Sequence, residues 1–94
     1  MLIKYSQHLE RRLILREIDY KLPEEIFKNA EERFVDTLTG HNIAVKRTLL
    51  YGKERDVMIA HVYEEDFVKL LTIHHLKEGQ KENRVRSGRW RRLQ

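Results

Sequence analysis

Three β-rich segments in the second half of the chain constrain the fold more than any other feature. They cover residues 43–51, 57–63 and 67–74, and short polar stretches separate them. Segments rich in β-branched and aromatic residues that are joined by such turns are typical of an antiparallel meander. The second and third segments carry apolar residues on both faces. We therefore expect them to be central strands that helices cover on at least one side.

A short strand and a helix are expected before this meander. Residues 2–5 alternate apolar and polar side chains, as a strand with one buried face does. Ser6 is a favourable N-cap for a helix over residues 7–17, because its hydroxyl can accept a hydrogen bond from the first turn. Leu9 and Leu13 lie one turn apart in this helix and are expected to face the core.

A second helix is expected to begin at Pro23, since a proline at the first helical position loses no backbone hydrogen bond. Ile26, Ala30 and Phe34 recur at helical spacing, and we expect the helix to end near Arg33. Together with the meander, these elements predict an α+β fold. Two N-terminal helices would pack on an antiparallel sheet of three to four strands.

Length and composition restrict the class of protein. The chain has 94 residues, the size of one domain, and no cysteine, which excludes disulfide frameworks, thiolate metal sites and cysteine nucleophiles. No apolar run approaches the roughly 20 residues that a membrane helix needs. The N-terminus lacks the apolar segment of a signal peptide. We therefore expect a cytoplasmic protein with no membrane partner.

Positive charge is concentrated at the C-terminal end. Residues 77–94 hold seven basic and two acidic residues, whereas residues 1–76 hold 12 basic and 13 acidic ones, so the C-terminal segment supplies all of the net charge of +4. We predict one α+β domain over residues 1–76 and a basic tail over residues 77–94. A polyanion is the partner that such a tail indicates, and the alternative is a solvated tail that binds nothing.

The tail interleaves arginines with one aromatic residue, a pattern typical of nucleic-acid binding. Arginines neutralise phosphates, and a tryptophan can stack on an unpaired base. We therefore predict nucleic-acid contacts from Arg84, Arg86, Arg89, Trp90, Arg91 and Arg92. Two alternatives stay open: the same residues can bind an acidic partner protein, and Trp90 can fill a place in the core.

The most specific local motif is His8-x3-Arg12-x3-Arg16. Steps of four residues advance only about 40° around a helix, so the three side chains form one stripe at the edge of the buried face. Arginine offers forked donors to phosphate oxygens, and histidine can exchange a proton near neutral pH. The stripe therefore predicts phosphate chemistry. The alternative is a structural stripe that pairs with Glu10, Asp19 or a carboxylate of the sheet.

Other histidines and acidic residues carry weaker signals. His61 lies in the second β-rich segment, while His74 and His75 end the third, so His61 can come close to one of that pair. The acidic residues at 64–66 are expected to form a solvated turn. No short-spaced histidine motif for zinc is present, and we predict no metal and no cofactor. Motifs of common hydrolases, such as the nucleophile elbow and the glycine-rich phosphate loop, are missing.

The run Y-S-Q-H-L-E-R-R-L-I-L-R-E-I-D resembles the opening of a bacterial and archaeal family of unknown function. That family begins with a strand that ends near a serine, and a helix with H-x3-R-x3-R follows. A second helix and three or four antiparallel strands come next. Here the motif falls on His8, Arg12 and Arg16, while Glu17 stands where the family usually has glycine. The resemblance covers most of residues 3–75.

The family is similar in architecture to the RelE-like and BrnT-like toxins of toxin–antitoxin systems. The resemblance therefore implies an RNA-cleaving protein that acts on RNA or at the ribosome and has an antitoxin protein as its partner. It implies catalytic roles for His8, Arg12 and Arg16, with contributions from Arg84 and Arg86. Two other classes stay open: a non-enzymatic nucleic-acid or protein-binding module that uses the tail, and a homo-oligomer that pairs along an exposed sheet edge.

Overall fold

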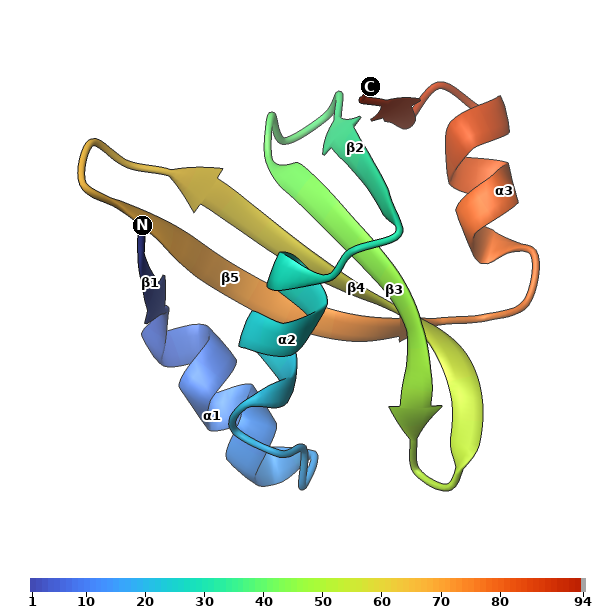
Figure 1. The fold of residues 1–94 in the computed structure, drawn as a ribbon. Coiled ribbons are helices and arrows are strands. Elements are labelled where there is room, and N and C mark those ends of the chain that lie inside the picture. The colour runs from blue at the N-terminus through green and yellow to red at the C-terminus, as the bar shows by residue number, and fades with distance from the viewer. Residues whose placement is uncertain (94) are drawn as a thin grey trace.

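Six strands and three helices make up residues 1–93, the part of the chain that the structure, a computed structural model, describes (Figure 1). The strands are β1 (Leu2–Tyr5), β2 (Glu32–Asp36), β3 (Asn42–Leu50), β4 (Lys53–Tyr63), β5 (Phe67–Leu76) and β6 (Trp90–Arg92). The helices are α1 (Gln7–Leu15), α2 (Leu22–Lys28) and α3 (Gln80–Arg86). The predicted α+β class is confirmed, as is the packing of the N-terminal helices on the sheet.

All six strands belong to one mixed sheet with the order β1-β5-β4-β3-β2-β6. The predicted meander is confirmed, because β4 pairs antiparallel with both β3 and β5. The prediction of a wholly antiparallel sheet of three to four strands is wrong on two counts. The strand β1 pairs in parallel with β5, and β2 and β6 extend the sheet beyond β3.

The segment after α2 is a strand rather than the end of a helix. α2 ends at Lys28 and β2 begins at Glu32, so the helix stops short of the predicted end near Arg33. In β2, Phe34 belongs to the apolar cluster on the face away from α2, where its ring lies 5.4 Å from that of Trp90. Burial against this distant ring outweighs the local helical spacing, since helix propensity is a weak preference.

Residues 77–93 are part of this fold and not a separate tail. α3 packs on the sheet through Val85, and β6 pairs with β2, which brings Trp90 opposite Asp36. The predicted boundary after Leu76 is therefore corrected. Apolar side chains are sparse beyond it, but one large aromatic residue is enough to bring the segment into the core, where its side chain is 1% exposed. Gln94, which ended the predicted tail, lies outside the described residues.

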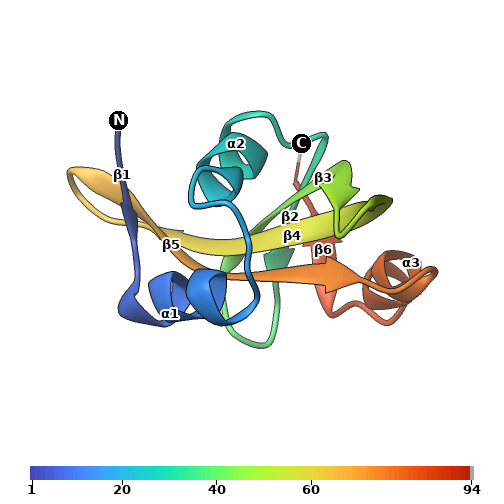
Figure 2. The ribbon, with the colours of Figure 1, turned by 90° about the horizontal axis from the view of Figure 1, so that it is seen from below.

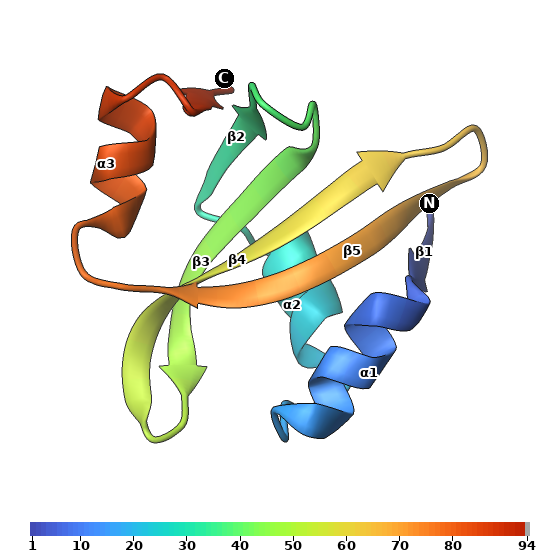
Figure 3. The ribbon, with the colours of Figure 1, turned by 180° about the vertical axis from the view of Figure 1, so that it is seen from behind.

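The helices cover the sheet unevenly (Figures 2 and 3). α2 lies over one face, α1 runs along the outer edge of β5, and α3 lies at one end of the opposite face. An apolar cluster that includes Leu9, Ile26 and Ile59 fills the space between the sheet and the first two helices. A second cluster, which includes Met58 and Trp90, fills the face under α3. Between α1 and α3, part of this second face has no helix over it.

Helix α1 ends in a residue with left-handed backbone. It stops at Leu15, two residues before the predicted end, and Glu17 has φ = 53°. The Glu17 amide donates to the Ile14 carbonyl (3.2 Å), and the Ile18 amide donates to the Leu13 carbonyl (2.9 Å). This pair of hydrogen bonds is a Schellman cap. Glycine is preferred at its left-handed position, because a Cβ atom is strained there.

Replacing Glu17 by glycine is expected to stabilise the protein. The substitution removes the Cβ strain at positive φ, and the net gain after the greater chain entropy of unfolded glycine is about 1 kcal/mol. The melting temperature, followed by circular dichroism, should rise by roughly 5 °C. Glu17→Ala is the control, because it removes the carboxylate and keeps the Cβ atom. A lower melting temperature for Glu17→Gly would contradict this description of the cap.

Candidate phosphate-binding site

Helix α1 is fastened to the edge of β5 that β1 leaves open. The Ser6 Oγ caps the helix by accepting from the Leu9 amide (3.0 Å), and the same hydroxyl donates to the Leu71 carbonyl (2.8 Å). One turn further on, Arg12 Nε donates to the Ile73 carbonyl (2.9 Å). Side chains of the helix thus satisfy carbonyl groups that a neighbouring strand would otherwise bind. This attachment fixes where the rest of the Arg12 guanidinium lies.

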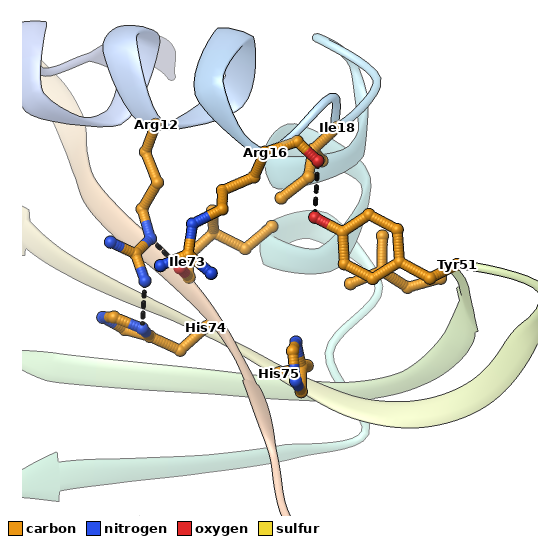
Figure 4. A pocket seen from close by; sticks show the side chains of 8 residues that line it. Arg12, Arg16, Ile18, Tyr51, Ile73, His74 and His75 are labelled. Carbon is orange, nitrogen blue, oxygen red and sulfur yellow. Dashed lines mark hydrogen bonds between the residues drawn. The ribbon is translucent and has the colours of Figure 1, made fainter.

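The second contact of Arg12 is with a histidine. Its terminal nitrogen lies 2.8 Å from Nδ1 of His74 (Figure 4). Because a guanidinium can only donate, Nδ1 is the acceptor, and the proton of the neutral imidazole lies on Nε2. Although part of the ring is exposed, partial burial and the Arg12 guanidinium lower the pKa of His74 to about 4. At neutral pH His74 is therefore an uncharged hydrogen-bond donor through Nε2.

Two further arginines and a histidine lie near this pair. Arg16, His8 and Arg84 each contribute to the lowering of the pKa of His74. Partial burial and the neighbouring Arg16 also lower the pKa of Arg12. The Arg12 and Arg16 side chains extend from α1 toward β5 (Figure 4). We call these five residues, His8, Arg12, Arg16, His74 and Arg84, the β5-edge cluster.

The arginines of the β5-edge cluster have no carboxylate within ion-pair distance in residues 1–93. Three arginines elsewhere form ion pairs with Asp56, Asp36 and Glu32. Bringing like charges together costs free energy unless an anion compensates them. The predicted ion pairs of the stripe with Glu10, Asp19 or a carboxylate of the sheet are not seen in this part of the chain, although Arg12 does bind a backbone carbonyl of β5. The cluster therefore has the composition of an anion-binding site.

A small pocket of about 80 Å³ opens beside this cluster. Arg12, Arg16, Tyr51, His74 and His75 are among the residues that line it (Figure 4). The Tyr51 hydroxyl donates to the Arg16 carbonyl and closes one side. Guanidinium and imidazole N–H groups around a small pocket suit the tetrahedral oxygens of a phosphate. Of the predicted stripe, Arg12 and Arg16 line this pocket and the exposed His8 does not, and the fold adds His74, whose role the motif did not indicate.

The residues predicted to form the tail differ in their burial and in their partners. Arg89 pairs with the buried Asp36 (2.8 Å) and Arg92 with Glu32 (2.7 Å), so both bind within the protein. Trp90 is buried, which corrects its predicted role: it cannot stack on a base. Of the remaining arginines, Arg86 and Arg91 are exposed. Arg84 is half-buried, with its guanidinium 5.3 Å from the centroid of the Trp90 ring, and it joins the β5-edge cluster.

The pair of Asp36 and Arg89 has a structural function. Partial burial by itself raises the pKa of Asp36, but hydrogen bonds from Arg89 and from the Thr39 and Leu38 amides lower it to about 2. The carboxylate thereby joins the turn after β2 to the segment before β6. This arrangement explains why Arg89, although it lies in the basic C-terminal segment, contributes no free positive charge.

His61 does not share a site with His74. His61 is buried, packs edge-on against Phe27 (centroids 4.9 Å apart), and has its pKa lowered to about 4 by burial. It therefore belongs to the α2 face. His74 lies opposite Met58 on the other face, so the two do not meet as expected. In residues 1–93 no group of three or more histidine, aspartate or glutamate side chains lies close enough to hold a metal ion.

Comparisons with protein-family models, with curated proteins and with solved structures found no match for this chain. Across residues 1–93, no helix is both long and apolar enough to cross a membrane. The assignment of a function therefore depends on the chemistry of the β5-edge cluster.

Proposed function

We propose that the protein binds RNA and that the β5-edge cluster is its phosphate site. The observation that carries the proposal is the gathering of Arg12, Arg16 and Arg84 around a neutral His74 with no carboxylate beside them in the described residues. Phosphate is the anion for which forked arginine donors are best suited. RNA is the phosphate compound indicated by the resemblance of the opening segment.

We further propose that the bound RNA is cleaved at this phosphate. The 2′-oxygen of one nucleotide attacks the adjacent phosphorus, and the bond from phosphorus to the 5′-oxygen breaks. His8 takes the 2′ proton as general base, and a proton from solvent reaches the leaving 5′-oxygen. Arg12 and Arg16 stabilise the charge that develops on the phosphate oxygens. The products are a 2′,3′-cyclic phosphate and a 5′-hydroxyl end.

The biological role that fits this chemistry is that of a toxin neutralised by an antitoxin protein. Two helices ahead of an antiparallel meander support the RelE-like architecture that the resemblance implies. In this role the natural substrate is messenger RNA at the ribosome or free RNA in the cytoplasm. The parallel strand β1 and the strands β2 and β6 lie outside the antiparallel meander that supports this architecture.

A second candidate is an RNA-binding protein that does not cleave its ligand. The observation that favours it is the state of the histidines. Nδ1 of His74 already accepts from Arg12, and no hydrogen bond among residues 1–93 orients the exposed His8. A general base is usually held in place by another group. Binding of phosphate through the arginines needs no such base, so binding and cleavage have to be measured separately.

Cleavage by the purified protein should require His8. RNA labelled at one end is incubated with wild-type protein, with and without ribosomes, and the product ends are identified chemically. We expect 2′,3′-cyclic phosphate ends from the wild type and a loss of at least about 100-fold in rate for His8→Ala, the usual size of a general-base contribution. Gln7→Ala, a change at the adjacent exposed residue, is the control and should cleave normally. If the wild-type protein binds RNA but leaves it intact, cleavage is excluded and the non-enzymatic RNA-binding candidate remains.

A further inference from the structure

A groove on the second face of the sheet adjoins the phosphate site. It has a volume of about 420 Å³ and lies between β5, α3 and the turn after β2. Six of its lining residues are Ile43, Met58, Ala60, Thr72, His74 and Arg84. The first three provide an apolar floor, and the others provide polar sides. The groove lies beside α3 on the face of the second apolar cluster, and its size falls in the range of small-ligand sites.

The groove adjoins the phosphate pocket. His74 and His75 line both hollows, so an anion held by Arg12 and Arg16 lies beside the mouth of the groove. On the far side stands Arg84, whose charge also acts on His74. The lining of the groove therefore contains the cations Lys77 and Arg84, the carboxylate of Asp36 is paired with Arg89, and the floor is apolar. A ligand that fits this arrangement has an anionic group at one end and a flat apolar group attached to it.

The chemistry of the walls matches a nucleobase. The rings of His41 and His74 and the guanidinium plane of Arg84 can stack on a base, and the Thr39 and Thr72 hydroxyls can bind its edge. The position of Arg84 is supported by Trp90, whose buried ring lies beneath it at 5.3 Å. Trp90 thus contributes to the groove indirectly, because its buried ring supports the Arg84 guanidinium that the ligand can contact.

We propose that this groove holds the base of a nucleotide whose phosphate is bound by the β5-edge cluster, so that the ligand is unpaired RNA. This inference rests on the proposed RNA binding. Bases of an A-form duplex are stacked and paired, and they reach such a groove only at the cost of unpairing. A single strand offers a base and the adjoining phosphate together without that cost.

The test compares three probes on two proteins. Affinities for inorganic phosphate, for a single-stranded RNA dodecamer and for the same dodecamer in a duplex are measured with wild type and with Thr72→Phe, which fills the groove. Wild type is expected to bind the single strand at least about tenfold more tightly than the duplex, the size of one base-stacking contact. Thr72→Phe should lose most of that preference and keep its affinity for phosphate. Thr48→Phe adds the same ring to β3 outside the groove lining and should behave as wild type.

Several results would overturn the inference, and they can be told apart. If wild type binds both RNAs equally through Arg12, only the assignment of the groove fails. If neither RNA binds, or if Arg12→Ala leaves the binding unchanged, the proposed function fails as well. The comparison of the two RNAs on the wild-type protein does not depend on the folding of any variant. Circular dichroism shows whether Thr72→Phe is folded, and a folded variant that retains the wild-type preference for single strands would also exclude the groove.

Discussion

Replacing Trp90 by alanine is expected to unfold the protein at moderate temperature. The side chain is 1% exposed, packs on Phe34 with the ring centroids 5.4 Å apart, and lies beneath Arg84. Removing a buried tryptophan costs about 3–5 kcal/mol, and a small domain has a total stability of roughly 5–15 kcal/mol. Thermal unfolding followed by circular dichroism should show a fall in melting temperature of more than about 10 °C.

Arg91→Ala is the matched control for this stability prediction, because Arg91 is adjacent, exposed and outside the ion pairs found in residues 1–93. Its melting temperature should stay within about 2 °C of wild type, as is usual for surface changes. Trp90→Phe keeps most of the burial and should be intermediate. A Trp90→Ala protein as stable as wild type would contradict the burial of this residue. It would instead support the sequence-based prediction that Trp90 is exposed and stacks on a nucleic-acid base.

The same packing limits how the C-terminal segment can be tested. A truncation after Leu76 removes α3, β6 and with them Trp90 from the second apolar cluster. It also leaves Asp36 without Arg89. We therefore expect the shortened chain to be unfolded, and a loss of RNA binding in it would say nothing about the basic residues. Single substitutions of exposed arginines are the suitable experiment for this segment.

The parts of the fold that local sequence determines are the parts that sequence predicts. The meander of β3, β4 and β5 is visible because each strand contains a run rich in apolar and β-branched residues that a polar stretch follows, although the charged residues 53–56, expected between two strands, belong to β4. The start of α1 is visible because Ser6 is followed at once by helix-forming residues, and its hydroxyl does accept from the third residue after it. These signals lie within a few residues of the structure that they specify.

The parts that were missed depend on contacts between distant residues. Phe34 lies at helical spacing from Ile26, but it belongs to β2 because Trp90, more than fifty positions later, packs against it. The short β6 has only three residues, too few for a visible alternation. The motif of His8, Arg12 and Arg16 indicated phosphate chemistry, but not that His74 joins it. That contact depends on how far β5 runs past α1, which no local pattern specifies.

Replacing Arg12 by alanine should have the largest effect on ligand binding. Arg12 holds His74, lies beside Arg16 and has no carboxylate partner in the described part of the chain. A charge-assisted hydrogen bond contributes about 1.5–3 kcal/mol, so RNA affinity should fall roughly 10- to 150-fold. Removal of the positive charge also favours protonation of His74. Its pKa, followed by NMR, should rise from about 4 toward 6.5 without reaching it, because partial burial remains.

A comparison of two variants, Arg12→Ala and Arg11→Ala, tests the central claim most directly. The quantity measured is the affinity of each variant for single-stranded RNA. The two variants lose the same charge from neighbouring positions of α1, but only Arg12 lines the pocket. We expect a loss of at least about tenfold for Arg12→Ala and a change within about twofold for the exposed Arg11, whose charge is screened by salt. Equal losses for both variants, or none for either, would show that RNA does not bind at the β5-edge cluster.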